Sequence, residues 1–156
     1  GMNQVTLFRD NQTGLDFAAD LGEVTPVSWQ PPAELGGVVL RLAAKRRVER
    51  AQNGTYTVSE ILGSGRRTAY ENDTLRWFGY CTYVIRQDER IIYVGMSNYG
   101  PQMRLKRHKY SGKPAIREAL AQLETVIDVT FYGTHADAAK AERLLIDRLM
   151  PEVNER

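Results

Sequence analysis

Short runs of aromatic and β-branched residues recur in the second half of the chain, with polar positions between them. Residues 80–85 and 91–94 are two such runs, and Gln87–Arg90 separates them, which is typical of an antiparallel hairpin. Residues 126–132 form the strongest strand pattern in the chain. This half is therefore expected to contain three strands.

Helical patterns fill the remaining segments. Pro101 suits the first turn of a helix that continues to Tyr110, and Pro114 opens a second helix that ends near Leu123. A third helix follows Thr134 with a start that resembles a capping box, and Pro151 ends it. The order β-β-α-α-β-α predicts an α+β fold in which a small antiparallel or mixed three-stranded sheet is flanked by helices.

The first half of the chain is less regular. The apolar residues 36–42 and the basic residues 45–50 precede Asn53-Gly54, a turn signal, and residues 55–58 alternate like a strand. The segment before Asn53 fits either a helix or a strand. A small winged-helix-like unit and an extension packed on the main domain are both open, and we favour the second. Residues 1–75 are thus predicted as an N-terminal extension or small accessory subdomain, and residues 76–156 as the main domain.

Charge is distributed unevenly although the net charge is only +2. Residues 1–75 carry eight Lys/Arg and nine Asp/Glu, whereas residues 76–156 carry thirteen and ten. Between Arg90 and Arg117 there are seven basic residues and no acidic one. Such a segment neutralises phosphates or forms a solvated basic face, and charge alone does not separate these readings.

Composition restricts the class of protein. Hydrophobic residues make up 42% and charged residues 26% of the chain, which is ordinary for a soluble globular protein. No apolar stretch approaches the roughly 20 residues that a membrane-spanning helix needs, and the first residues lack the pattern of a signal peptide. Cys81 is the only cysteine, so an internal disulfide and a multi-cysteine zinc site are excluded. We expect a cytoplasmic protein with no membrane partner.

Five elements in residues 79–156 resemble the GIY-YIG nucleases, and they occur in the family's order. Cys81-Thr82-Tyr83 and Tyr93-Val94-Gly95 resemble the two tripeptides that name the family, although the first keeps only its tyrosine. Residues 104–108 resemble its Arg-x-x-x-His helix. Glu142 lies in a segment similar to the helix that carries the metal-binding glutamate, and residues 151–154 resemble the closing Pro-x-x-Asn.

The resemblance implies a metal-dependent endonuclease that hydrolyses DNA phosphodiester bonds in repair, restriction or a mobile element. Glu142 would hold one Mg²⁺ or Mn²⁺ ion per active site. Tyr83, with His108 as its proton acceptor, would activate the attacking water or act as a relay. The implied catalytic residues are Tyr83, Tyr93, Arg104, His108, Glu142 and Asn154, and the implied DNA-binding residues are Lys106, Arg107, Lys109, Lys113 and Arg117.

Elementary chemistry is consistent with these roles. Arg104 and His108 are four residues apart, so both project from one side of a helix, and Arg104 can fork onto a phosphate. Neighbouring strands bring Tyr83 and Tyr93 to a common face, where Tyr93 would orient water or phosphate. A carboxylate such as Glu142 is the hard oxygen ligand that Mg²⁺ prefers. Asn154 is expected to brace the site by hydrogen bonding more than to touch substrate.

Two other functions stay open. A non-catalytic nucleic-acid-binding module that kept the fold and the basic helix is favoured if Tyr83, Arg104 and Glu142 do not converge in space. A generic α+β interaction protein that matches the motifs by chance is favoured if the motif residues are scattered over separate surfaces. A double-strand cut by a single-site enzyme requires either a homodimer or two successive events. The sequence does not identify the DNA sequence or structure that is recognised.

Overall fold

The computed structural model describes residues 24–27, 51–62, 76–122 and 124–154. From residue 80 onward the order is the predicted β-β-α-α-β-α: β2 (Tyr80–Gln87), β3 (Arg90–Ser97), α6 (Pro101–Ser111), α7 (Pro114–Leu120), β4 (Val126–Tyr132) and α8 (His135–Leu149). A short strand β1 (Gly54–Thr57) and helix α4 (Val58–Leu62) precede them. The α+β class is confirmed.

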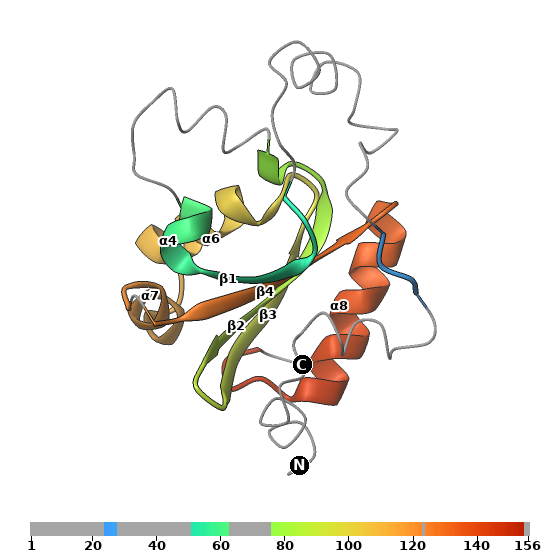
Figure 1. The fold of residues 1–156 in the computed structure, drawn as a ribbon. Coiled ribbons are helices and arrows are strands. Elements are labelled where there is room, and N and C mark those ends of the chain that lie inside the picture. Colours follow the sequence, from blue (N-terminus) through green and yellow to red (C-terminus); the bar gives the residue numbers. More distant parts are fainter. Residues whose placement is uncertain (1–23, 28–50, 63–75, 123, 155–156) are drawn as a thin grey trace.

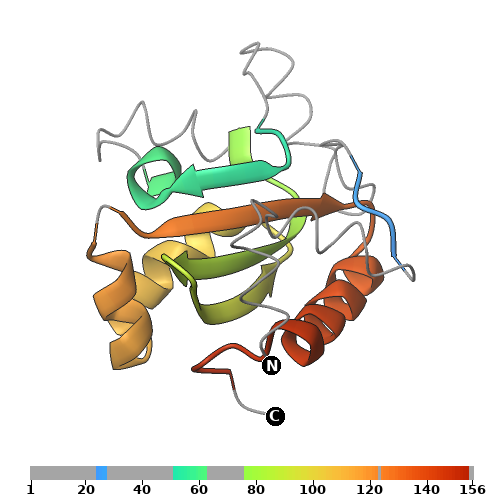
Figure 2. The same ribbon diagram turned by 60° about the horizontal axis from the view of Figure 1, so that its bottom comes forward.

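The predicted count of three strands is wrong. The sheet in the described residues has four strands in the order β1-β4-β2-β3, and every neighbouring pair is antiparallel. Strand β1 pairs with β4 from Gly54↔Val129 to Thr57↔Val126 and forms the edge remote from β3 (Figure 2). The alternating pattern of residues 55–58 indicates a strand, but a local pattern does not reveal a partner far along the chain, so it does not join this strand to the sheet.

Helices cover both faces of this sheet (Figure 1). On β2, Tyr83 and Ile85 pack in one buried cluster with residues of α4, α6 and α7. Val84, which points to the opposite face, packs against Leu145 and Leu149 of α8. This alternation follows from the two-residue period of a strand and turns Tyr83 toward the side of the sheet that carries α6.

Specific residues set the start of α6 and of α8, the two helices that matter most for the site. Gly100 precedes Pro101 with φ of 94°, and a Cβ there would lie 2.0 Å from the Trp77 carbonyl oxygen, so only glycine fits this turn. At the start of α8, Thr134 Oγ1 accepts a hydrogen bond from the Asp137 amide at 3.1 Å, which confirms the predicted cap. The start of both helices is therefore set locally.

After α8 the chain turns back along β3. Glu152 and Val153 donate backbone hydrogen bonds to the carbonyls of Ile91 and Ile92 at 3.0 and 3.1 Å. At the exposed start of β3, a guanidinium nitrogen of Arg90 forms an ion pair with Glu152 Oε1 at 2.7 Å. The segment thus covers the exposed edge of β3 and brings Asn154 close to the sheet.

Most of residues 1–75 lies outside the described part of the chain, including the apolar residues 36–42 and the basic residues 45–50. The division into residues 1–75 and 76–156 remains a prediction. Among the described helices, none has both the length and the apolar character to cross a membrane.

Candidate active site

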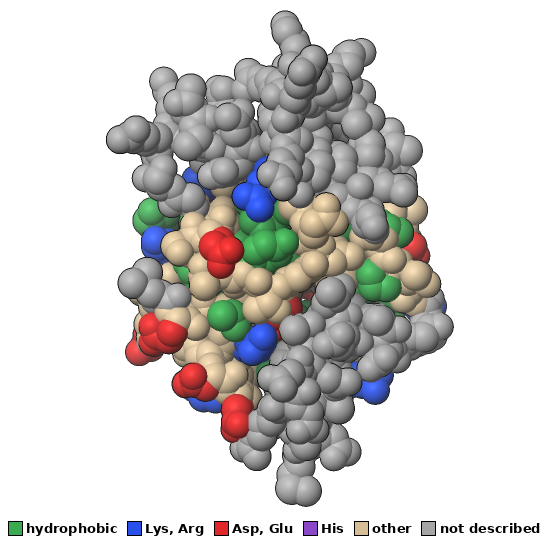
Figure 3. All heavy atoms as spheres, viewed as in Figure 1, with side chains coloured by type: hydrophobic (Ala, Val, Ile, Leu, Met, Phe, Trp, Pro, Cys, Tyr) green, Lys and Arg blue, Asp and Glu red, His purple; other side chains and the backbone are tan. Residues whose placement is uncertain are grey.

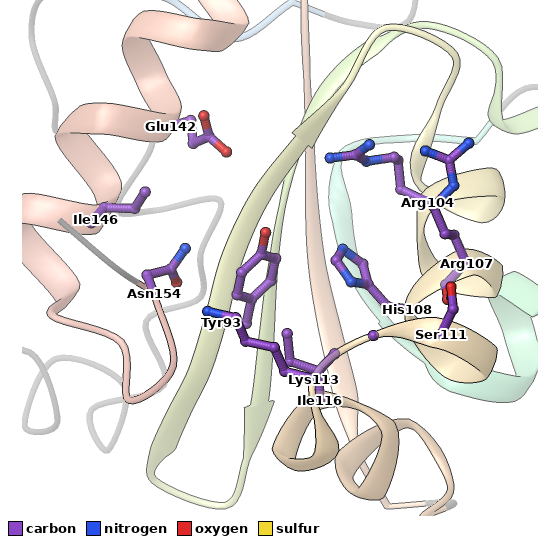
Figure 4. A pocket seen from close by; sticks show the side chains of 11 residues that line it. Tyr93, Arg104, Arg107, His108, Ser111, Lys113, Ile116, Glu142, Ile146 and Asn154 are labelled. Atoms are coloured by element: carbon purple, nitrogen blue, oxygen red, sulfur yellow. The ribbon is translucent and has the colours of Figure 1, made fainter.

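A cavity of about 550 Å³ lies across β3 between α6 and α8. Figure 4 shows side chains from both helices, from β3 and from the C-terminal segment directed toward this space. Five of the six predicted catalytic residues line it: Tyr93, Arg104, His108, Glu142 and Asn154. The sixth, Tyr83, lies behind them in the core.

Both tyrosines lie on the face of the sheet that carries α6. Tyr83 is opposite Gly95 in the register of β2 and β3, and Tyr93 is opposite Ile85, so the two tyrosines are diagonal neighbours. Their ring centroids are 6.2 Å apart. Tyr83 is fully buried, whereas Tyr93 is half-buried and points its hydroxyl into the cavity (Figure 4). Tyr93 is therefore the tyrosine that a substrate can reach.

Gly95 is a site residue whose role sequence reasoning did not identify. A Cβ on Gly95 would lie 2.5 Å from the Tyr83 hydroxyl and from its Cζ atom, far inside contact distance. The Tyr83 ring thus crosses the strand where only a hydrogen atom fits. The signal that could have revealed this role is the pairing of Tyr83 with Gly95 across the hairpin, which becomes visible only when the register of the two strands is known.

The Tyr83 hydroxyl and His108 Nε2 are 3.0 Å apart. Burial raises the pKa of Tyr83, and the neighbouring Tyr93 adds to this, while the charge and hydrogen bond of Arg104 oppose it. Burial also lowers the pKa of His108, assisted by the positive charges of Arg104 and Arg107. Both groups are thus neutral at neutral pH. With the imidazole proton on Nδ1, the phenol donates to Nε2, which holds the imidazole in one orientation and leaves it able to take up a proton.

This protonation state predicts the acid limb of a pH–rate profile. Because the pKa of His108 lies below the ordinary 6.5, its imidazole is mostly neutral at pH 6.5 and becomes mostly protonated only at lower pH. The cleavage rate proposed below is expected to hold between pH 7.5 and 6.5, to within about twofold, and to fall under more acidic conditions. An inflection at or above pH 6.5 in single-turnover rates, absent from His108→Gln, would contradict a neutral His108.

Arg104 brings an unsatisfied donor to the site. Its Nε atom is buried and has no hydrogen-bond partner within the described residues. The guanidinium extends from α6 into the cavity and faces Glu142 across it (Figure 4). A buried donor without a partner carries a desolvation cost of about 1–3 kcal/mol, which an anion bound in the cavity would offset. Arg104 thus offers a donor that an anion in the cavity would satisfy.

Glu142 approaches from α8 on the opposite side. It is half-buried, and burial raises the pKa of its carboxyl group, while the charges of Arg104 and Arg143 act in the opposite direction. Burial and the charge of Glu142 together raise the pKa of Tyr93. Among the described residues that line the cavity, Glu142 supplies the sole carboxylate. A carboxylate in this environment gains stability from a cation.

The residues fit a hard, largely hydrated cation better than a metal ion enclosed by several protein ligands. No group of three or more His, Cys, Asp or Glu within the described ranges is arranged to bind a metal ion. One carboxylate beside an open cavity suits Mg²⁺, which keeps several water ligands and takes others from a substrate phosphate. The donor set therefore agrees with one Mg²⁺ or Mn²⁺ ion on Glu142.

Asn154 lines the cavity but commits its amide group to the backbone of β3. Its Oδ1 accepts from the Val94 amide and its Nδ2 donates to the Val94 carbonyl, both at 2.8 Å. This pair of hydrogen bonds holds the C-terminal segment beside Tyr93. The geometry matches the expected bracing role.

The five predicted DNA-binding residues do not share one location. Arg107 and Lys113 line the cavity, whereas Lys106, Lys109 and Arg117 are not among its lining residues. Figure 3 shows acidic side chains at the lower left of the molecule, near the β2–β3 turn, where Asp88 and Glu89 are exposed. An acidic surface repels phosphate groups.

Four lining residues were not predicted: Ser111, Gly112, Ile116 and Ile146. Ser111 and Gly112 end α6 through contacts within the chain, since Ser111 Oγ donates to the Arg107 carbonyl at 2.9 Å and Gly112 N donates to that of His108 at 3.0 Å. The helical position of Ile146, four residues after Glu142, was the available signal for its place in the cavity.

Comparisons with protein-family models, with curated proteins and with solved structures gave no match.

Proposed function

We propose that this chain is a GIY-YIG-type endonuclease that hydrolyses DNA phosphodiester bonds with one Mg²⁺ or Mn²⁺ ion. The observation that carries the proposal is the pairing of Arg104 and Glu142 across one cavity. A buried guanidinium donor without a partner and a half-buried carboxylate face the same space from two helices. A phosphate bound to a cation complements both groups.

The remaining residues have separable roles. Arg104 binds the scissile phosphate and stabilises the charge that develops on it. The Tyr93 hydroxyl, which points into the cavity, orients water or phosphate. Because Tyr83 has no exposed surface, its hydrogen bond orients His108, and His108, which lines the cavity, takes up the proton of the attacking water. A metal ion on Glu142, when bound, would neutralise the phosphate and stabilise the leaving 3′ oxygen.

The basic residues at the cavity predict a defined salt dependence. Arg107→Ala combined with Lys113→Ala removes two phosphate-neutralising charges, so the slope of log affinity against log salt should decrease by about 1.8 on duplex DNA. Arg148→Ala, which removes an exposed charge on α8 away from the cavity, should leave this slope unchanged. An unaltered slope in the double variant would place the DNA on another surface.

The proposal is tested by incubating the purified chain with supercoiled plasmid and with a flapped or branched oligonucleotide. Each substrate is offered with Mg²⁺, with Mn²⁺ and with chelator. Cleavage that depends on the metal ion supports the nuclease, and the preferred substrate separates restriction from repair. DNA binding by folded protein that cuts none of these substrates would favour the alternative, a catalytically inactive nucleic-acid-binding module.

A further inference from the structure

A second hollow, of about 230 Å³, lies where β3 ends and α6 begins. Its lining consists of Met96, Ser97, Asn98, Tyr99 and Arg104. Arg104 also lines the larger cavity, so the two spaces meet at this side chain. The hollow is smaller than the roughly 300–1,000 Å³ of pockets that enclose drug-sized ligands, which suits a single flat ring.

Tyr99 supplies an aromatic wall to this hollow. Tyr99 is 49% exposed. The Tyr99 amide donates to Ser97 Oγ at 3.1 Å, and its ring meets Phe78 edge-on with centroids 5.9 Å apart. The ring is therefore held in place while half of its surface faces solvent.

Asn98 adds a polar group beside the ring. Its Oδ1 lies 2.7 Å from His135 Nδ1 at the start of α8, a contact that orients the amide. The amide nitrogen supplies two donor hydrogens for the edge of a planar ligand. A fixed aromatic ring, a neighbouring amide and the guanidinium of Arg104 are the groups that together recognise a base and its adjoining phosphate.

We propose that this hollow is a subsite for one unpaired DNA base, which stacks on Tyr99 while the adjoining phosphate lies on Arg104. The assignment rests on the proposed nuclease function and adds its substrate class, DNA with a single-stranded or displaced nucleotide next to the cut. A base inside a duplex is stacked on its neighbours, so it reaches Tyr99 only after leaving the helix. Stacking is tolerant of base identity, so the preference is for structure more than for sequence.

The test measures binding in the presence of chelator, so that it does not depend on cleavage. Fluorescence anisotropy gives the affinity for a fully paired duplex and for the same duplex with a single-stranded thymidine flap. The wild-type protein should bind the flapped DNA more tightly, and Tyr99→Ala should weaken that binding about 5- to 150-fold, the range for losing one base–aromatic stack. Its affinity for the paired duplex should stay within about twofold.

Two variants serve as controls. Tyr99→Phe keeps the aromatic ring and should keep the preference for flapped DNA. Tyr110→Ala removes the 76% exposed tyrosine near the end of α6, outside the hollow, and should leave the ratio of the two affinities unchanged. Because the readout is a ratio, a misfolded Tyr99→Ala protein is recognised by equal losses on both DNAs, and Tyr99→Phe then decides.

Several results would overturn the subsite. These are a wild-type protein that binds both DNAs equally, a Tyr99→Ala protein with an unchanged ratio, or a Tyr99→Phe protein that loses the preference. The outcome is separate from that of the nuclease proposal. A protein that prefers flapped DNA through Tyr99 but never cuts would refute the nuclease and keep the subsite, whereas cutting with no such preference would do the reverse.

Discussion

Replacement of Glu142 by alanine is expected to abolish metal-dependent cleavage, with a loss of about 10³-fold or more, while DNA affinity changes by less than about threefold. The loss follows because Glu142 is the sole carboxylate among the described residues lining the cavity, and metal catalysis contributes several kcal/mol to charge stabilisation. Affinity persists because Arg104, Arg107 and Lys113 remain. Single-turnover rates and anisotropy on the same oligonucleotide provide both quantities.

A stability measurement separates this effect from unfolding. Burial raises the pKa of Glu142, so the ionised carboxylate destabilises the folded state relative to the neutral form, and stability falls as pH rises through that pKa. The neutral Glu142→Gln side chain should therefore raise the Tm slightly at neutral pH. Asp147→Asn, an exposed acid on the same helix, should keep full activity. Retained metal-dependent cleavage in Glu142→Ala would contradict the assignment.

Gly95→Ala is expected to lower cleavage by at least about 100-fold although Gly95 contributes no side chain to the chemistry. The added Cβ would lie 2.5 Å from the Tyr83 hydroxyl, so the buried ring must move and its 3.0 Å contact with His108 Nε2 must change. Overpacking of this kind also costs about 1–3 kcal/mol of unfolding free energy. Rate, thermal unfolding and the NMR signals of the His108 imidazole report the three consequences.

Gly133→Ala provides the matched control. A Cβ on Gly133 meets no atom within 4 Å, so this variant should leave rate and stability near those of the wild-type protein. A Gly95→Ala protein with wild-type rate and an unperturbed His108 signal would show that the position of Tyr83 does not affect the chemistry. A loss of rate in both variants would show that the effect does not depend on the contact between Gly95 and Tyr83.

Local patterns predicted the helices well where a proline or a capping side chain marks the start of the helix. Pro101 and Pro114 begin α6 and α7, and Thr134 caps α8, because each satisfies or removes a backbone donor within its own turn. The hairpin of β2 and β3 follows from two adjacent β-rich runs. These features depend on neighbours in sequence, so the sequence alone reveals them.

The pairing of strands that are far apart in the sequence was the feature that the sequence did not predict. The partner of β1 is β4, and Asn53 strengthens this contact by accepting a hydrogen bond from the Phe131 amide at 2.8 Å. Asn53 was interpreted as a turn residue because its side-chain partner is distant in the chain. A register irregularity pairs Ile85 with Tyr93 and Arg86 with Ile91, which leaves Ile92 between them. Such a bulge changes which face a residue occupies, and the hydrophobic pattern does not show it.

The sequence predicted which residue types form the candidate site, and the structure shows how deeply each of them is buried. The motif resemblance identified Arg104, His108 and Glu142, and the structure brings them to one cavity. It also separates the two tyrosines, since Tyr83 is buried and Tyr93 lines the cavity. Burial depends on the packing of α6 against the sheet, which the order of motifs does not contain. The crossing of Tyr83 over Gly95 became evident only with the register.

The most direct test of the central claim is the cleavage rate of supercoiled plasmid by the wild-type chain, measured as a function of Mg²⁺ concentration. A single carboxylate at the cavity predicts a rate that rises hyperbolically, is first-order in Mg²⁺ at low concentration and vanishes with chelator. Undiminished cleavage in chelator, or bound DNA that remains uncut at every Mg²⁺ concentration, would contradict the claim that this cavity hydrolyses DNA with one metal ion.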